Sequence, residues 1–92
     1  MIKSFCHKGI QQFFEIGSKA GVNAEHASKL ARQLMLLNVA KSPQEMDVIG
    51  WKLHPLKGEL IDHWAVKVSG NWRLTFTFEG EDAILVDYQD YH

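Results

Sequence analysis

Two of the five histidines, His54 and His92, stand where an imidazole could take part in chemistry. His54 precedes a proline, which fixes the backbone that follows it, and Lys57 comes three residues later. His92 ends the sequence directly after Asp90 and Tyr91. The ordinary pKa of an imidazole is about 6.5, so its acid and base forms are both available near neutral pH. These positions therefore suggest general acid–base catalysis.

Two cations could bind an anion beside these histidines. Residues 64–68 and 72–78 alternate between apolar and polar side chains, which predicts two strands joined by a tight loop. A two-residue loop at 70–71 would set apolar against polar residues along the ladder. A three-residue loop at 69–71 instead pairs Val68 with Trp72, Val66 with Leu74 and Trp64 with Phe76 on one face, so this register is favoured.

In the favoured register, Lys67 lies directly opposite Arg73 on the face away from the apolar row. Like charges in this position destabilise a sheet, and an anion bound between them would remove the penalty. The alternative is that both long side chains turn into water.

Together these residues suggest one reaction, the cleavage of RNA by attack of its own 2′-hydroxyl. That reaction needs a base for the hydroxyl proton, an acid for the departing 5′-oxygen, and cations around the phosphorane oxygens. The two histidines and the two opposed cations supply these groups without a metal. Tyr91 could stack on a base or donate a proton, and Asp90 could orient a histidine. Since the histidines form no helical pair at metal-binding spacing and Cys6 is the only cysteine, no metal site and no cofactor are predicted.

The elements that must position these residues fall into a helical half and a β half. The pattern of the first half predicts a strand at 2–6 and a helix at 9–16 that ends at Gly17 or Gly21. A second helix is predicted from Asn23 to about Ala40, and a short third helix begins at 42–45. In this reading His26 lies on the solvent face of the second helix. From Gly50 the apolar period becomes two, which predicts strands at 51–53, 64–68, 72–78 and 83–88, with Pro55 ending the first of them or restricting it to an edge.

Length and composition indicate one domain, residues 1–92, of an ordinary globular protein. Hydrophobic residues make up 46% of the chain and the net charge is −1. The charges from Trp51 to Phe78 are mostly basic, and every charge from Glu79 onward is acidic, so a local anion-attracting patch can exist on a neutral protein. A lone cysteine and the lack of a signal peptide or of an apolar span of about 20 residues predict a cytoplasmic protein without membrane contact.

Several motifs, in their order and spacing, resemble one family over essentially the whole chain. They are Trp51-Lys52-Leu53-His54-Pro55-Leu56-Lys57-Gly58, then Trp64-Ala65-Val66-Lys67-Val68, Asn71-Trp72-Arg73-Leu74-Thr75-Phe76, and Asp90-Tyr91-His92. The sequence is similar to the HigB toxins of the RelE/ParE superfamily of bacterial toxin–antitoxin systems.

The resemblance implies an α+β, RelE-like fold, with two or three N-terminal helices packed on a twisted, mainly antiparallel sheet. It also implies an endonuclease that cuts mRNA in the ribosomal A site, in contact with ribosomal RNA. The implied partner is a HigA-type helix-turn-helix antitoxin, which alone would contact operator DNA. By likeness to the family motifs, the catalytic residues are His54, Asp90, Tyr91 and His92, and the RNA phosphate contacts are Lys57, Lys67 and Arg73.

Two departures and two alternatives accompany this interpretation. Many relatives have an arginine shortly after the Lys-Gly turn, where this chain reads Glu59-Leu60-Ile61, and Ser69 is neutral where some relatives are basic. Fewer cations predict weaker attachment to phosphates. One alternative is a ParE-like toxin that inhibits DNA gyrase by protein–protein contact, although such a protein has no chemical need for the histidine and cation set. The other is a passive binding module, which needs no histidines.

Overall fold

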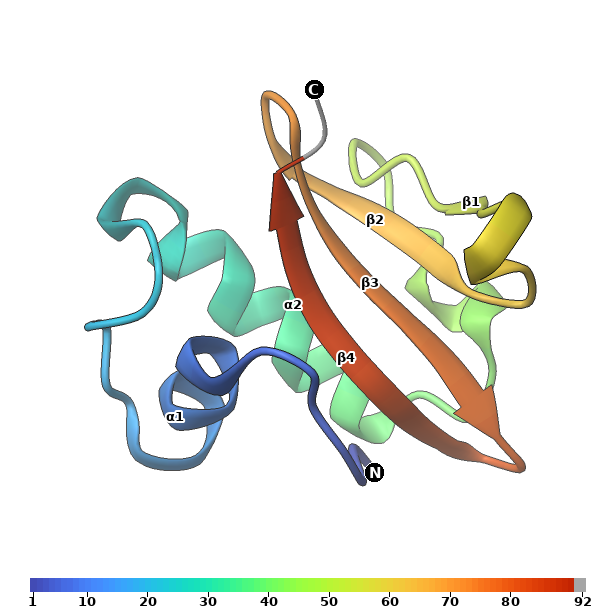
Figure 1. The fold of residues 1–92 in the computed structure, drawn as a ribbon, viewed down its shortest axis with the longest axis horizontal. Coiled ribbons are helices and arrows are strands. Elements are labelled where there is room, and N and C mark those ends of the chain that lie inside the picture. The colour runs from blue at the N-terminus through green and yellow to red at the C-terminus, as the bar shows by residue number, and fades with distance from the viewer. Residues whose placement is uncertain (91–92) are drawn as a thin grey trace.

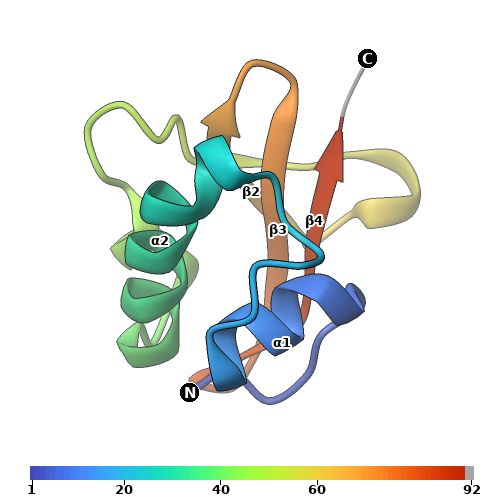
Figure 2. The ribbon, with the colours of Figure 1, turned by 90° about the vertical axis from the view of Figure 1, so that its left-hand side faces the viewer.

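A computed structural model describes residues 1–90, in which two α-helices pack on one side of a four-stranded antiparallel sheet (Figures 1 and 2). The helices are α1 (Lys8–Ile16) and α2 (Ala27–Val39). The strands, in their order across the sheet, are β1 (His54–Pro55), β2 (Trp64–Ser69), β3 (Trp72–Glu79) and β4 (Asp82–Asp90). Within residues 1–90, the helices are too short and too polar for any of them to cross a membrane.

The helix boundaries follow from local capping. The Nδ1 atom of His7 accepts a hydrogen bond from the Ile10 N–H (3.0 Å) and starts α1. Gly17, one of the two predicted ends, terminates α1 with a left-handed φ of 75°. The Asn23 side chain accepts from Glu25 N–H (3.1 Å) and begins the 3₁₀ turn η1 (Ala24–His26), which leads directly into α2.

The predicted third helix is a single 3₁₀ turn, η2 (Pro43–Met46). The Ser42 side chain makes no capping hydrogen bond at its start, and the Glu45 carboxylate accepts from the Lys41 N–H (3.0 Å). The α+β class is therefore confirmed with two α-helices.

The core lies between α2 and the inner face of the sheet. Leu30, Leu34 and Leu37 from α2 are at most 1% exposed. They join a buried cluster with residues of the central strands, including Val66, Leu74 and Phe76. Burial of a side chain of this size contributes about 1.5–3 kcal/mol, so this layer holds the helices against the sheet.

The central hairpin has the predicted register from Trp64 to Lys67, but the predicted Val68–Trp72 pair and the predicted three-residue loop are wrong. Trp64 pairs with Phe76, Val66 with Leu74 and Lys67 with Arg73. The loop contains two residues, Gly70 and Asn71, because Ser69 pairs with Trp72. The ladder shifts between Lys67 and Ser69, so Val68 is an extra, bulged residue that stays 2% exposed. The bulge lets a tight turn coexist with the apolar pairing.

A second irregularity interrupts β4. Leu85 has a left-handed φ of 55°, and the β3–β4 ladder shifts between Thr75 and Thr77. The predicted first strand at 2–6 lies beside β4 as two isolated parallel bridges, Ile2 with Ala83 and Phe5 with Val86. It is not a continuous strand because the Ser4 hydroxyl, rather than a backbone carbonyl, accepts from the Leu85 N–H between the two bridges (2.9 Å).

The strand predicted at 51–53 is wrong, since β1 occupies His54–Pro55. Lys52 has a φ of 53°, outside the extended region of a regular strand, and the Trp51 side chain is 9% exposed in the core. The position of Pro55 on the edge strand agrees with the sequence. The 3₁₀ turn η3 (Gly58–Leu60) then leads toward β2.

Two glycines let the start of α1 touch the connection between the helices. A Cβ atom added to Gly9 would lie 2.7 Å from the Cα atom of Gly21, and one added to Gly21 would lie 2.5 Å from the Cα atom of Gly9. Both neighbours are backbone atoms, so any side chain here would push the two segments apart.

Candidate active site

The strand register places three of the predicted site residues on the outer face of the sheet, away from the helices. Lys67 pairs with Arg73, and Arg73 pairs with Gln89 of β4. His54 pairs with Ala65, the second residue before Lys67 on β2. Directly paired residues share a face, and residues two apart on a strand do too. His54, Lys67 and Arg73 therefore form two neighbouring rows on one surface.

Lys67 and Arg73 are a closely approaching pair. The Lys67 N–H donates to the Trp51 carbonyl (2.6 Å), and the Lys67 carbonyl accepts from the Gln33 side chain (2.9 Å). Both backbone groups of Lys67 thus point away from β3, which identifies a non-hydrogen-bonded pair with Cα atoms about 4.5 Å apart. Side chains approach most closely in such pairs, so the register puts the two cations at the type of position where like charges destabilise a sheet.

The Arg73 guanidinium is held by the hairpin rather than by a carboxylate. Its Nη1 atom donates to the carbonyls of Gly70 (3.0 Å) and Trp72 (3.2 Å). Among residues 1–90, no carboxylate lies within ion-pairing distance of either Arg73 or Lys67. Their positive charges are therefore available to an anion from outside the described chain.

The His54 imidazole is fixed in one tautomer. Its Nδ1 atom lies 2.8 Å from the Lys52 carbonyl oxygen, and a carbonyl only accepts hydrogen bonds. The proton of neutral His54 is therefore on Nδ1, and Nε2 has a free lone pair. The left-handed backbone of Lys52, which appeared to interrupt a strand, directs this carbonyl. An imidazole held in this way can act as a base through Nε2.

The other predicted site residues lie around this surface or outside the described residues. Lys57 is exposed at the start of η3, three residues beyond His54. Asp90 ends β4 opposite Trp72, so the register directs it to the face opposite Arg73. Tyr91 and His92 lie outside the described residues.

A cationic extension on α2 was missed by the sequence analysis. The Gln33 Nε2 atom donates to the Lys67 carbonyl, which brings α2 against the open edge of β2. Lys29 stands one helical turn before Gln33, on the same side of α2. Burial, together with the positive charges of Lys67 and Arg32, lowers the pKa of Lys29. The sequence alone presents Lys29 and Arg32 as an ordinary solvated helix face.

A buried aromatic cluster supports the ends of β3 and β4, and it corrects the expectation that His26 faces solvent. His26 is 5% exposed, and its Nδ1 atom lies 2.6 Å from the Tyr88 hydroxyl. The Trp72 ring stacks on Tyr88 with centroids 4.5 Å apart, and the His7 ring meets Tyr88 edge-on. Burial raises the pKa of Tyr88, so the phenol remains a neutral hydrogen-bonding group. The cluster anchors β4 two residues before Asp90.

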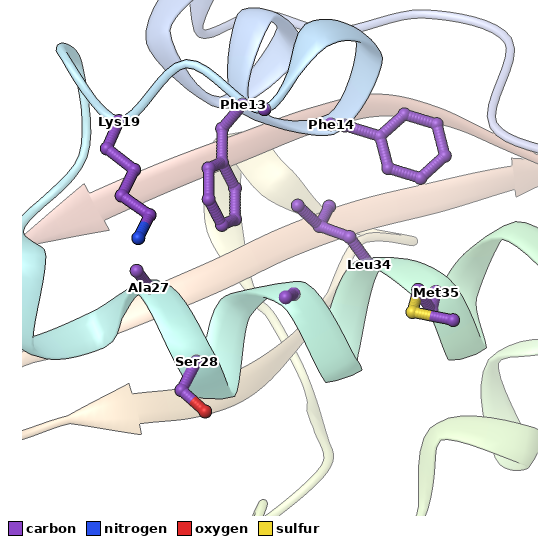
Figure 3. A pocket seen from close by; sticks show the side chains of 9 residues that line it. Phe13, Phe14, Lys19, Ala27, Ser28, Leu34 and Met35 are labelled. Atoms are coloured by element: carbon purple, nitrogen blue, oxygen red, sulfur yellow. The ribbon is translucent and has the colours of Figure 1, made fainter.

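An apolar cavity lies elsewhere, between α1 and α2 on the helix side of the sheet. Its volume is about 490 Å³, and its lining is mainly apolar. In Figure 3 the Phe13 ring points from α1 toward α2, and the Lys19 side chain reaches toward Ala27. None of the predicted site residues lines it. Residues 1–90 contain no cluster of three or more His, Cys, Asp or Glu side chains arranged to hold a metal ion.

Comparison with known proteins agrees with the resemblance. The family model described as "RelE-like toxin of type II toxin-antitoxin system HigB" matches residues 3–92. The protein "Endoribonuclease HigB" of Proteus vulgaris is 41% identical over 92 residues, which cover 100% of both chains. The chain therefore belongs to the HigB family of RelE-like toxins of type II toxin–antitoxin systems.

Proposed function

We propose that this toxin is an endoribonuclease that cuts mRNA in the ribosomal A site, by attack of the 2′-hydroxyl on the neighbouring phosphodiester without a metal. The observation that contributes most is the outer face, where a histidine with a free Nε2 lies near two opposed cations. The Proteus vulgaris relative, named an endoribonuclease, supports the same reaction class. A gyrase inhibitor would have no use for this arrangement.

His54 acts as the general base in this proposal. Its Nδ1–H is engaged with the Lys52 carbonyl, so Nε2 receives the 2′-hydroxyl proton. The hydrogen bond to the carbonyl also stabilises the imidazolium that results, because the donor becomes cationic. In this proposal His92, with Tyr91, supplies the acid that protonates the leaving 5′-oxygen. Asp90, which the register directs to the face opposite Arg73, orients His92 and does not contact the phosphate. The proximity of β4 to Arg73, through the Gln89 pair, supports a role for this end of the chain.

Lys67 and Arg73 hold the scissile phosphate between them, and Lys57 contacts a neighbouring phosphate. The negative phosphorane oxygens cancel the repulsion of the opposed pair, and the cancellation is strongest in the transition state, where the oxygens have most charge. Lys29 and Arg32 continue the positive surface onto α2 and contact the RNA backbone farther along the strand.

The partners follow from the same proposal. A toxin of a type II system has an antitoxin, and we infer a HigA-type helix-turn-helix protein that alone contacts operator DNA. The ribosome supplies the mRNA and additional RNA contacts, so the toxin acts in the cytoplasm. Residues 1–92 act as one domain in this scheme.

The experiment compares two histidines that resemble each other locally. His63 also has Nδ1 near the carbonyl two residues before it (3.5 Å), yet it lies outside the proposed catalytic set. Loss of a general base typically slows a reaction by about 10²–10⁴-fold, so His54→Ala should abolish codon-phased cuts detected by primer extension on translated mRNA. His63→Ala should retain them. Equal cutting by both variants, or intact transcripts with wild-type toxin, would contradict the proposal.

A further inference from the structure

The groove between α1 and α2 has an apolar wall that the fold itself does not cover. Ala27, Ala31 and Met35 line the groove at intervals of four along α2, with Ala27 buried at its inner end, and Val39 continues the same ridge beyond the lining. Met35 is 69% exposed and Val39 is 67% exposed. The opposite wall contains Phe13 and Phe14 of α1.

This surface differs from the scattered apolar residues that any protein exposes. A cavity of about 490 Å³ has the size of a site that receives several side chains, and a contiguous exposed apolar patch usually marks an interface. Beside the Phe13 ring, the Lys19 side chain reaches over the groove toward Ala27 (Figure 3). The groove therefore offers an apolar floor with a cation at its side.

We propose that the groove between α1 and α2 is the docking site of the protein antitoxin, which inserts an amphipathic helix with an apolar anchor against Met35 and Phe13 and an acidic residue against Lys19. A ridge with a spacing of four residues matches the spacing of anchors on an amphipathic helix. The acidic residue follows from charge complementarity with Lys19. The proposal rests on membership of a type II toxin family, which requires such a partner, and is independent of the endoribonuclease proposal.

The groove lies away from the candidate active site, so antitoxin binding can be disrupted without loss of toxicity. The groove lies on the helix side of the sheet, and the opposed cations Lys67 and Arg73 lie on the outer face. A groove variant should therefore still arrest growth when expressed alone, and it should lose protection by the antitoxin.

The test is a matched pair of substitutions in the complete toxin, with affinity for its purified cognate antitoxin as the measurement. Met35→Glu places a carboxylate on the exposed ridge with a good helix former, so folding is preserved. Ile49→Glu makes the same change at a fully exposed apolar residue that does not line the groove. We expect Met35→Glu to raise the Kd about 100-fold or more, as for a central interface residue, and Ile49→Glu to leave it unchanged.

A second pair tests the charge. Lys19→Glu should raise the Kd about tenfold and should make the affinity less favourable at low salt, whereas Lys41→Glu, at an exposed cation outside the groove, should have no such effect. Unchanged antitoxin affinity in Met35→Glu would overturn the proposal. A toxin dimer that Met35→Glu dissociates while antitoxin binding persists would also overturn it, because the occupant would then be a second copy. Loss of growth arrest in the folded variant would do the same, because the groove would then serve the toxic reaction.

Discussion

Replacement of Lys67 by glutamine should make the toxin more stable and less able to hold RNA. Lys67 faces Arg73 in a non-hydrogen-bonded pair, where opposed side chains approach most closely. Like charges at such a position cost a few tenths of a kcal/mol at low salt. A change of about 1 kcal/mol in the free energy of unfolding shifts the thermal unfolding midpoint (Tm) of a domain of this size by about 4–8 °C. Lys67→Gln should therefore raise the Tm by about 1–3 °C.

The same substitution removes one phosphate contact. Each contact with single-stranded RNA contributes about 0.7 to the slope of log K against log salt concentration, which amounts to about fivefold in affinity at 0.1 M salt. The assay is binding to ribosomes programmed with an mRNA that has a 2′-O-methyl group at the A-site codon, across a salt series at fixed magnesium. Lys67→Gln should lower both the affinity and the slope.

Lys41→Gln is the matched control, because Lys41 is an exposed cation outside the outer face. It should change neither the Tm nor the salt slope. The stability gain of Lys67→Gln should disappear near 1 M salt, where the Debye length falls to about 3 Å. A destabilised Lys67→Gln variant, or one with the wild-type salt slope, would refute the interpretation that Lys67 and Arg73 form an anion site that is strained when empty.

Two further perturbations test the supports of this site. Tyr88→Phe removes the 2.6 Å contact with the buried imidazole of His26, and it should cost about 1–3 kcal/mol in urea unfolding; an unchanged unfolding midpoint would show that the contact is not a net stabilising interaction. The pKa of Lys29 in the folded chain is below its ordinary value of 10.5, so charged Lys29 opposes folding at neutral pH. Lys29→Gln should therefore raise the urea midpoint at pH 7, and its advantage should shrink as the pH approaches 10.5 and wild-type Lys29 loses its proton; a constant or reversed difference would contradict this reasoning.

The main ladder of the sheet was predictable because its register has only two choices. One choice buries Val66, Leu74 and Phe76 together, and the other would expose them, so hydrophobic alternation decides the pairing. The opposed cations follow from that register with no further information. The end of α1 was predictable for a similar reason, because Gly17 adopts a left-handed conformation that favours glycine.

The irregular backbone was not predictable from local patterns. A bulge at Val68 allows a two-residue turn together with the apolar pairing. The alternation of apolar and polar residues along a strand does not indicate where an extra residue is inserted. Lys52 and Leu85 adopt left-handed conformations that side chains of their type rarely enter. The Leu85 N–H donates to the hydroxyl of Ser4, 81 positions away, so no local window contains that contact.

The surroundings of the candidate site were missed because they depend on packing between elements. His26 is polar and precedes an amphipathic helix, which favours a solvent-exposed interpretation, but the Tyr88 hydroxyl makes burial tolerable. Lys29 joins the cationic surface only because Gln33 reaches across to β2. Each of these relations joins residues more than thirty positions apart.

The bare contact between Gly9 and Gly21 offers a way to build a conditional toxin. A single methyl group at either position would meet backbone atoms that cannot rotate away, so α1 and the connection after it must separate. Neither glycine belongs to the outer face or to the groove lining. Gly21→Ala is therefore a rational starting point for a heat-sensitive allele. A laboratory strain could express such a toxin at a high temperature, where the toxin is inactive, and activate it by cooling.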